Sequence, residues 1–229
     1  MKLNIVDLGI IDYKEALELQ EKLQKLLIER KTGEDFLLLL EHPPVLTLGR
    51  RGSRDNILTD VSRLEEMGVK IYDVNRGGDI TYHGPGQIVG YPVIDLNNIG
   101  RDIKEFVWKV EEVFIRLLDR EYGIAAEREE KKYTGVWVED SKITAIGIAV
   151  RQWVTMHGFA FNVNTDLSHF GWINPCGITD RGVTSLRQLT GQKQDMRKLF
   201  SKVSEYFCQV FGYEADMLDR DEFVKMLTN

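Results

Sequence analysis

The chain has 229 residues, 43% of them hydrophobic and 29% charged, which suits one large globular domain with a hydrophobic core. Its formal net charge of −6 argues against nucleic acid as the main partner, since phosphate binding needs a basic face. The first twenty residues contain acidic side chains, and no apolar run is long enough to cross a bilayer, so we predict neither a signal peptide nor membrane insertion. Because Cys176 and Cys208 are the only cysteines of the sequence, we expect a cytoplasmic protein without a disulfide framework.

Helical spacing of apolar residues first appears at residues 12–31, where Asp12 is a suitable N-cap. The same spacing predicts helices at 60–67, 103–121 and 195–211, and a short acidic helix at the end of the chain. Short apolar or β-branched runs predict strands at 35–41, 45–48, 69–74, 88–96 and 157–164, and a hairpin at 135–150.

The order of these elements bears on the fold class. Strands outnumber helices, and neighbouring strands often have hairpin-like links. We therefore predict an α/β (α+β) fold, with a mixed, largely antiparallel sheet flanked by helices rather than a doubly wound sheet. The sequence shows no linker, so we expect one domain over residues 1–229, with a small helical lobe at about 193–229.

The segment RGGDITYHGPGQ, residues 76–87, combines four glycines and a proline with charged and aromatic side chains, and we interpret it as a loop. Glycine lets backbone N–H groups approach a ligand closely, so one interpretation is a cradle for a polar or anionic substrate group. The other interpretation is an elaborate surface turn. The segment lacks both the dinucleotide fingerprint and the P-loop pattern.

Two further residues could carry chemistry. Cys176 lies in the turn NPCGI, where an exposed thiolate would be a strong nucleophile, although a half-buried loop residue is equally compatible with the sequence. Lys142 lies at the predicted hairpin turn and could lower the pKa of a neighbouring thiol, but the sequence does not show that they are adjacent. Cys208 belongs to a helical stripe and is expected to pack.

The four histidines show no metal-ligand spacing, so we predict no metal site. His83 is the best functional candidate because it lies in the glycine-rich segment, whereas His42 precedes two prolines and suits a structural role. His157 precedes a glycine and suits either role. His169 is close to Cys176 in the sequence, so a Cys–His nucleophile pair is still possible.

The motifs RGGDITYHGPGQ, KITAIG, HGFAFNVNTDL and NPCGI occur in this order, and over about residues 34–190 the chain resembles the lipoyl(octanoyl) transferases. This resemblance implies a catalytic fold like that of biotin- and lipoate-protein ligases. It also implies a ping-pong reaction, in which an octanoyl group passes from acyl carrier protein to a cysteine and then to a lysine of a lipoyl domain. The acceptors would be lipoyl domains of 2-oxoacid dehydrogenase complexes or the glycine cleavage H protein, and no cofactor is expected.

By match to the motifs, Cys176 would be the nucleophile, and Lys142 would depress its pKa and assist proton transfer. The residues implied to line the acyl site are Arg76, Gly77, Gly78, Asp79, Ile80, Thr81, Tyr82, His83, Ala145, Ile146, Gly147, Gly158, Phe159 and Ala160. We also propose the basic run Arg50, Arg51 and Arg54 as a docking patch for the acidic carrier protein, with a solvated loop as the alternative.

Three other functions stay open from the sequence. An ATP-dependent lipoate- or biotin-protein ligase would share the fold but would need no cysteine nucleophile. A cysteine hydrolase would use Cys176 with His169 or His83 and would transfer the acyl group to water. A non-catalytic acyl-binding module would keep the fold without turnover.

Overall fold

The computed structural model describes residues 1–129, 133–174 and 181–227. Its α-helices are α1 (Tyr13–Ile28), α2 (Val61–Glu66), α3 (Ile103–Tyr122), α4 (Leu186–Thr190), α5 (Met196–Phe211) and α6 (Arg220–Met226). Its strands are β1 (Lys2–Ile10), β2 (Asp35–Glu41), β3 (Val45–Leu48), β4 (Lys70–Asp73), β5 (Ile80–His83), β6 (Gln87–Val93), β7 (Glu127–Arg128), β8 (Gly135–Val138), β9 (Ser141–Arg151), β10 (Val154–Asn162), β11 (Gly182–Val183) and β12 (Glu214–Met217).

Most of the described strands form one large sheet in the order β12-β1-β2-β6-β10-β9-β8-β7, and β11 also pairs with β9. Strand β1 runs parallel to both β12 and β2, whereas the pairs from β2 through β6, β10, β9 and β8 to β7 are antiparallel. The prediction of a mixed, largely antiparallel sheet flanked by helices is therefore confirmed.

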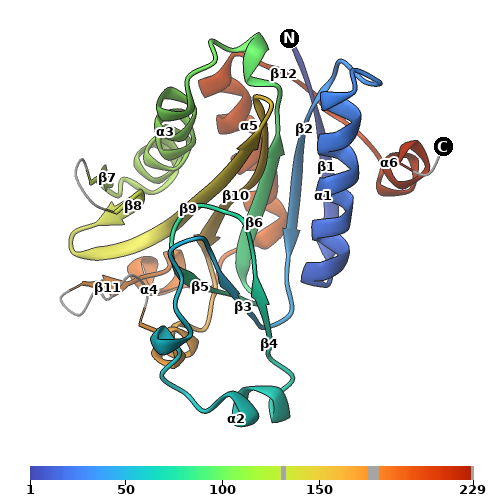
Figure 1. Ribbon diagram of the computed structural model, residues 1–229. Helices are drawn as coiled ribbons and strands as arrows, with labels where there is room; N and C mark the ends of the chain where they lie inside the picture. The colour runs from blue at the N-terminus through green and yellow to red at the C-terminus, as the bar shows by residue number, and fades with distance from the viewer. Residues whose placement is uncertain (130–132, 175–180, 228–229) are drawn as a thin grey trace.

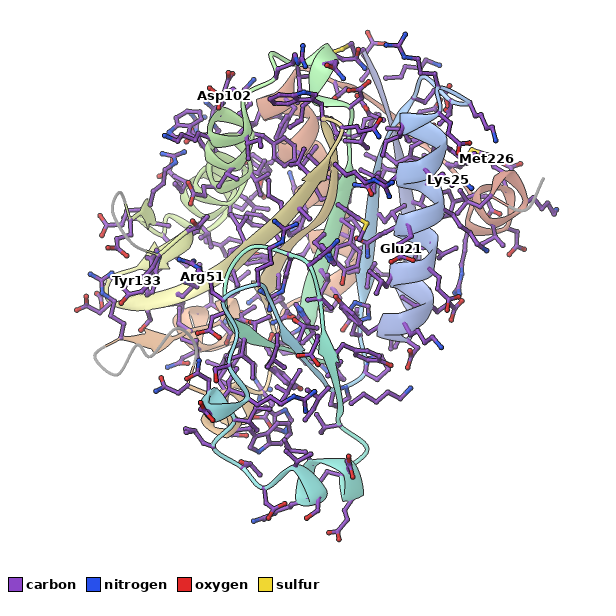
Figure 2. The ribbon with its side chains drawn as sticks, in the orientation of Figure 1. Glu21, Lys25, Arg51, Asp102, Tyr133 and Met226 are labelled. Atoms are coloured by element: carbon purple, nitrogen blue, oxygen red, sulfur yellow. The ribbon has the colours of Figure 1, made fainter. Side chains whose placement is uncertain are left out.

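Two hydrophobic cores lie on the two faces of the large sheet (Figure 1). Helices α3 and α5 cover one face, where Phe114 and Phe207 pack with Phe161 of β10. Helix α1 covers the other face, where Leu23 packs with Tyr91 of β6, and Glu21 and Lys25 are exposed on its outer side (Figure 2). Alternation along the strands explains this division, because successive side chains of a strand point to opposite faces.

A smaller sheet, in the order β4-β3-β5, lies in front of β9, β10 and β6 in the view of Figure 1. Its own apolar cluster contains Leu46, Ile80, Tyr82 and Ile173. The small sheet therefore brings the glycine-rich segment, which contains β5, to the face of the large sheet that also carries α1.

The predicted helices and strands are found close to their expected bounds, and Asp12 caps α1 by accepting a hydrogen bond from Lys14 N at 2.9 Å. Two local predictions need correction. The segment 76–87 is not a loop throughout, because Ile80–His83 forms β5 and pairs antiparallel with β3. The first ten residues, for which we predicted no strand, form β1, which is held by pairing on both sides.

The residues near the C-terminus contribute to the same core and sheet as the rest of the chain. Helix α5 packs on α3 through Val203 and Phe207, and β12 pairs with β1. Helix α6 packs Phe223 against Phe36 on the opposite face. Among the described residues, no helix is both long enough and apolar enough to span a membrane.

Candidate active site

A pocket of about 910 Å³ lies between the two sheets. Its floor is the α1 face of the large sheet, with Tyr91 of β6, Ala160 of β10 and Ala145 of β9. Its cover comes from the small sheet and the glycine-rich segment, and Tyr13 of α1 closes one side. Arg51 and Tyr133, both labelled in Figure 2, also line it. A pocket of this size with a mostly apolar floor is typical of a small-molecule binding site.

The buried side chain of Arg76 holds the backbone of the glycine-rich segment in place. Its guanidinium is buried and donates to the backbone oxygen of Thr47 at 2.7 Å, to the Thr47 hydroxyl at 2.9 Å and to Gly77 O at 3.0 Å. The Gly77 amide donates to Ile148 O at 2.8 Å, which fastens the segment to β9. The positive charge therefore lies inside the pocket wall and is directed at backbone oxygens.

Glycine is required where the segment crosses β9. A Cβ atom on Gly147 would lie 2.7 Å from Gly77 O, so the two backbones can approach this closely only without a side chain. Gly78 has φ +88°, a conformation that other residues rarely adopt. Among the hydrogen bonds of the described residues, none uses the amide of Gly78 or Asp79 as donor. These two amides are therefore candidate donors for an oxyanion.

The polar wall of the pocket is a connected network that starts at His83. His83 Nδ1 donates to Gln87 Oε1 at 2.8 Å, and Gln87 Nε2 donates to Asn162 Oδ1 at 2.9 Å. Asn162 in turn donates to Thr184 O at 3.1 Å. Burial, with repulsion from neighbouring positive charge, lowers the pKa of His83 to about 3, so its imidazole is neutral. His83 therefore supports the wall and is poorly suited to act as a base near neutral pH.

Lys142 lies half-buried on β9, borders the pocket and places its ammonium over the ring of Trp137. Its ammonium donates to Thr134 O at 3.1 Å. The peptide unit between Thr134 and Gly135 is also held through its N–H group, because Gly135 N donates to Glu111 Oε1 at 3.0 Å. Burial raises the pKa of Glu111, and the nearby charges of Arg128 and Lys142 oppose that increase. The sequence reasoning missed Glu111, which lies among the core-facing residues of α3.

Cys176 lies outside the described residues. The preceding residue that the structure describes, Asn174, is anchored by its amide to Asn56 O at 2.8 Å. The Asn56 side chain donates to Asp79 Oδ2 at 2.9 Å, and Asp79 Oδ1 accepts from Ile80 N at 2.6 Å. The start of the NPCGI motif is thus tied through Asn56 to the glycine-rich segment.

Besides Arg76, three arginines border the pocket, and we call Arg50, Arg51 and Arg181 the rim arginines. Backbone hydrogen bonds hold two of them against the glycine-rich segment, from Arg50 N to Arg76 O at 3.0 Å and from Arg51 N to Gly78 O at 3.1 Å. Arg54, the third member of the predicted docking patch, does not border the pocket and forms an ion pair with Asp73 at 2.8 Å.

The remaining histidines have separate positions. His42 donates to Ile11 O and accepts from the Tyr91 hydroxyl, both at 2.8 Å, as expected for a structural residue. His169 lies 2.8 Å from the Tyr82 hydroxyl and stacks on Trp172. Cys208 is buried in the α3–α5 core, and burial raises the pKa of its thiol. No cluster of metal-ligating side chains occurs within residues 1–129, 133–174 and 181–227.

The structure brings almost all the described site candidates to this pocket. Those that border it are Lys142, Arg76, Gly77, Gly78, Asp79, Ile80, Thr81, His83, Ala145, Ile146, Gly147, Gly158, Phe159 and Ala160. Tyr82 does not border it, because alternation along β5 turns its ring toward Phe170 and Trp172 of the small-sheet cluster. Residues that the sequence did not single out as lining it include Tyr13, Tyr91 and Asn162.

Comparison with known proteins shows which family the chain belongs to. Residues 12–208 match the lipoyl protein ligase A/B catalytic domain. The chain is 57% identical over 227 residues to an octanoyltransferase of Caldicellulosiruptor saccharolyticus, covering 99% of this chain and 96% of that protein. It is 59% identical over 219 residues to an octanoyltransferase of Desulforamulus reducens, covering 96% and 95% of the two chains.

Among solved structures, the chain is similar to a bipartite lipoate protein ligase from Thermoplasma acidophilum. The TM-score is 0.75 at 16% sequence identity, with 99% of this chain and 90% of that chain covered. This similarity concerns the fold and confirms the prediction of a biotin- and lipoate-ligase-like architecture.

Proposed function

Because the chain belongs to the lipoyl protein ligase A/B catalytic domain family and is an acyltransferase of the octanoyltransferase type, we propose that it carries an octanoyl group on Cys176. The donor would be the thioester of an acyl carrier protein, and the acceptor a lysine of a lipoyl domain. One observation carries the proposal. Identity to octanoyltransferases is 57–59% over nearly the whole chain, whereas similarity to a lipoate protein ligase is limited to the fold.

The first half-reaction exchanges one thioester for another. The Cys176 thiolate attacks the carbonyl carbon of the donor, and the carrier thiolate leaves with the electron pair of the broken C–S bond. Such an exchange is nearly balanced in energy and needs no ATP. The amides of Gly78 and Asp79, which have no acceptor among the described residues, would stabilise the oxyanion of the tetrahedral intermediate.

The second half-reaction forms an amide. The acceptor amine attacks the Cys176 thioester, a C–N bond forms, and the cysteine leaves as thiolate. The amine must lose a proton, and Lys142 in its neutral form would accept it. The position of Lys142 at the border of the pocket, with its Nζ held on Thr134 O, supports this role.

The rim arginines support an acidic carrier as the donor. Arg50 and Arg51 are joined to the glycine-rich segment by backbone hydrogen bonds, so a carrier docked on them would lie next to the pocket. Compared with the patch predicted from the sequence, Arg181 is added because it borders the pocket, where it also forms an ion pair with Glu129 at 3.8 Å, and Arg54 is left out because it does not border the pocket. The specific acceptor, a 2-oxoacid dehydrogenase lipoyl domain or the glycine cleavage H protein, is likewise a proposal.

The test is intact-protein mass spectrometry after mixing with octanoyl–acyl carrier protein in the absence of ATP. Wild type should gain one octanoyl group and lose it when a lipoyl domain is added, whereas Cys176→Ala should gain none. Lys142→Ala should form and discharge the adduct much more slowly at neutral pH. Transfer that requires ATP and free acid would identify a ligase, and release of free octanoate alone would identify a hydrolase.

A further inference from the structure

Glu111 is a buried carboxylate to which the proposed mechanism gives no role. It lies on the core-facing side of α3 and is only 6% exposed. Its Oε1 atom accepts from Gly135 N at 3.0 Å, and its Oε2 atom lies 3.5 Å from Nε of Arg128 on β7. Because a buried carboxylate is unfavourable unless it is paired and hydrogen-bonded, these two contacts favour its charged form.

One peptide unit joins Glu111 to Lys142. The N–H group of Gly135 donates to Glu111 Oε1 at 3.0 Å, and the carbonyl oxygen of Thr134 accepts from Lys142 Nζ at 3.1 Å. With the width of the peptide added to these two distances, Oε1 and Nζ are at most roughly 8.5 Å apart. A carboxylate bound to the N–H group polarises the peptide, so its carbonyl oxygen becomes a better acceptor for the ammonium.

The same peptide also shapes the path of the lysine side chain. Gly135 has φ +138°, and a Cβ atom on it would lie 2.5 Å from Thr144 O and 3.3 Å from Lys142 Cε. The stem of Lys142 therefore passes close to a backbone that has no side chain at this point. Beyond the stem, the ammonium lies 4.8 Å from the centre of the Trp137 ring. The direction of the ammonium thus depends on where this peptide is held.

Charge couples Glu111 to Lys142 in addition to this geometry. Burial raises the pKa of Glu111, whereas the N–H group of Gly135 and the charges of Arg128 and Lys142 lower it. An electrostatic interaction acts equally on both partners, so ionised Glu111 favours the charged form of Lys142.

Other charged groups near Lys142 oppose or neutralise one another. The guanidinium of Arg181 lies 5.1 Å from the centre of the Trp137 ring, over which the Lys142 ammonium also lies, and its charge favours the neutral form of the lysine. Arg181 is itself paired with Glu129 at 3.8 Å. The negative charge of Glu111 therefore acts on Lys142 against a neighbouring positive charge.

Building on the function proposed above, we propose that Glu111 is a positioning residue for Lys142. Through the peptide between Thr134 and Gly135 it holds the direction of Nζ, and its charge stabilises the ammonium that forms when Lys142 takes the proton of the acceptor amine. No other bond changes in this step, because the proton moves from the amine nitrogen to Nζ. Glu111 thus makes Lys142 a stronger base, and it raises the pH at which the lysine becomes neutral.

The experiment follows the second half-reaction alone. The octanoyl adduct is formed from octanoyl–acyl carrier protein, isolated and mixed with excess lipoyl domain at a series of pH values, and its loss is followed by intact-protein mass spectrometry. The acceptor amine titrates identically in every reaction, so differences between variants come from the enzyme. Glu111→Gln should move the midpoint of the rising limb to lower pH by about 0.5 units or more. It should also lower the plateau rate about two-fold or more, because a weaker base accepts the proton.

Two variants separate the charge of Glu111 from a general structural effect. Glu112→Gln removes the same charge one position along α3, where the side chain pairs with Arg116 and Arg128. This control should leave the midpoint unchanged. Glu111→Asp keeps the charge but shortens the side chain, so it should lower the rate while the midpoint stays close to that of wild type.

A second measurement does not depend on acyl transfer. In protein labelled with carbon-13 at lysine Cε, NMR follows the titration of Lys142, whose signal is identified by its loss in Lys142→Arg. The midpoint of Lys142 should be lower in Glu111→Gln than in wild type by about 0.5 pH units or more, and unchanged in Glu112→Gln. The dispersion of the same spectra shows whether each variant is folded.

The inference fails if Glu111→Gln leaves the midpoint unchanged, or if Glu112→Gln moves it equally far. It also fails if Glu111→Gln lowers the rate by the same factor at every pH, as a purely structural role would. If Glu111→Gln does not fold, wild-type rates for Glu111→Asp at every pH would refute the positioning role. Absence of any octanoyl adduct on wild type would overturn the proposed function, whereas the titration of Lys142 would still test its coupling to Glu111.

Discussion

Asp35 → Asn should change how the stability of the protein depends on pH. Asp35 begins β2 and is only 4% exposed. Its carboxylate accepts from the Tyr213 hydroxyl at 2.7 Å and from Asp95 N at 2.8 Å. Burial nevertheless dominates over these two donors and raises the pKa of Asp35 from 3.8 to about 6.

The sign and size of the effect follow from this difference. Below pH 3.8 the group is protonated in both the folded and the unfolded chain, so the native state has its full stability from this site. Between pH 3.8 and about 6 the unfolded chain releases the proton while the folded chain retains it, so the free energy of unfolding falls. Above pH 6 the loss is complete and amounts to roughly 3 kcal/mol.

The assay is denaturant unfolding at a series of pH values from 4 to 7 for wild type and Asp35→Asn. Asparagine cannot ionise, so the variant should gain most of those roughly 3 kcal/mol relative to wild type as the pH rises. Tyr213→Phe removes one donor to the carboxylate, so it should raise the folded-state pKa of Asp35 further and extend the loss of stability to higher pH. Glu21→Gln, on the exposed side of α1, is the control. A stability difference between wild type and Asp35→Asn that does not vary with pH would refute the reasoning.

Three other predictions concern the site. Glu111→Gln keeps an oxygen for the 134–135 peptide but removes a negative charge near Lys142, so the rising limb of the pH–rate profile should move to lower pH; an unmoved profile would contradict this role. Gly147→Ala should lower kcat/KM by about 100-fold because the added Cβ displaces the glycine-rich segment, whereas Gly33→Ala, with open space at its Cβ, should not. Neutralising the rim arginines should flatten the salt dependence of transfer from acyl carrier protein, and an unchanged dependence would count against docking there.

The sequence alone predicted the features that depend on residues close together in the chain. Helix α1 and its Asp12 cap, helix α3, and the β8–β9 hairpin all follow from spacings of a few residues. The order of the motifs also indicated the family, and the relatives with 57% and 59% identity confirm it.

Strands stabilised by distant partners were harder to predict. The glycines around Ile80–His83 are typical of a turn, yet these four residues form β5 because β3 offers them a complete antiparallel edge. Strand β1 gains its stability from β12 and β2, which come from opposite ends of the chain. Whether such a strand forms depends on which distant segment lies beside it, so the β-propensity of its own residues does not predict it.

What the sequence by itself determined is a set of chemical groups: a cysteine turn, a lysine at a hairpin, a glycine-rich segment and four histidines. Only the tertiary structure decided which of them share a pocket. It turned Tyr82 away from the pocket and brought Glu111 behind the peptide that holds Lys142. The reason is that side-chain direction depends on strand register and on contacts between distant segments, and both are fixed only when the two sheets pack together.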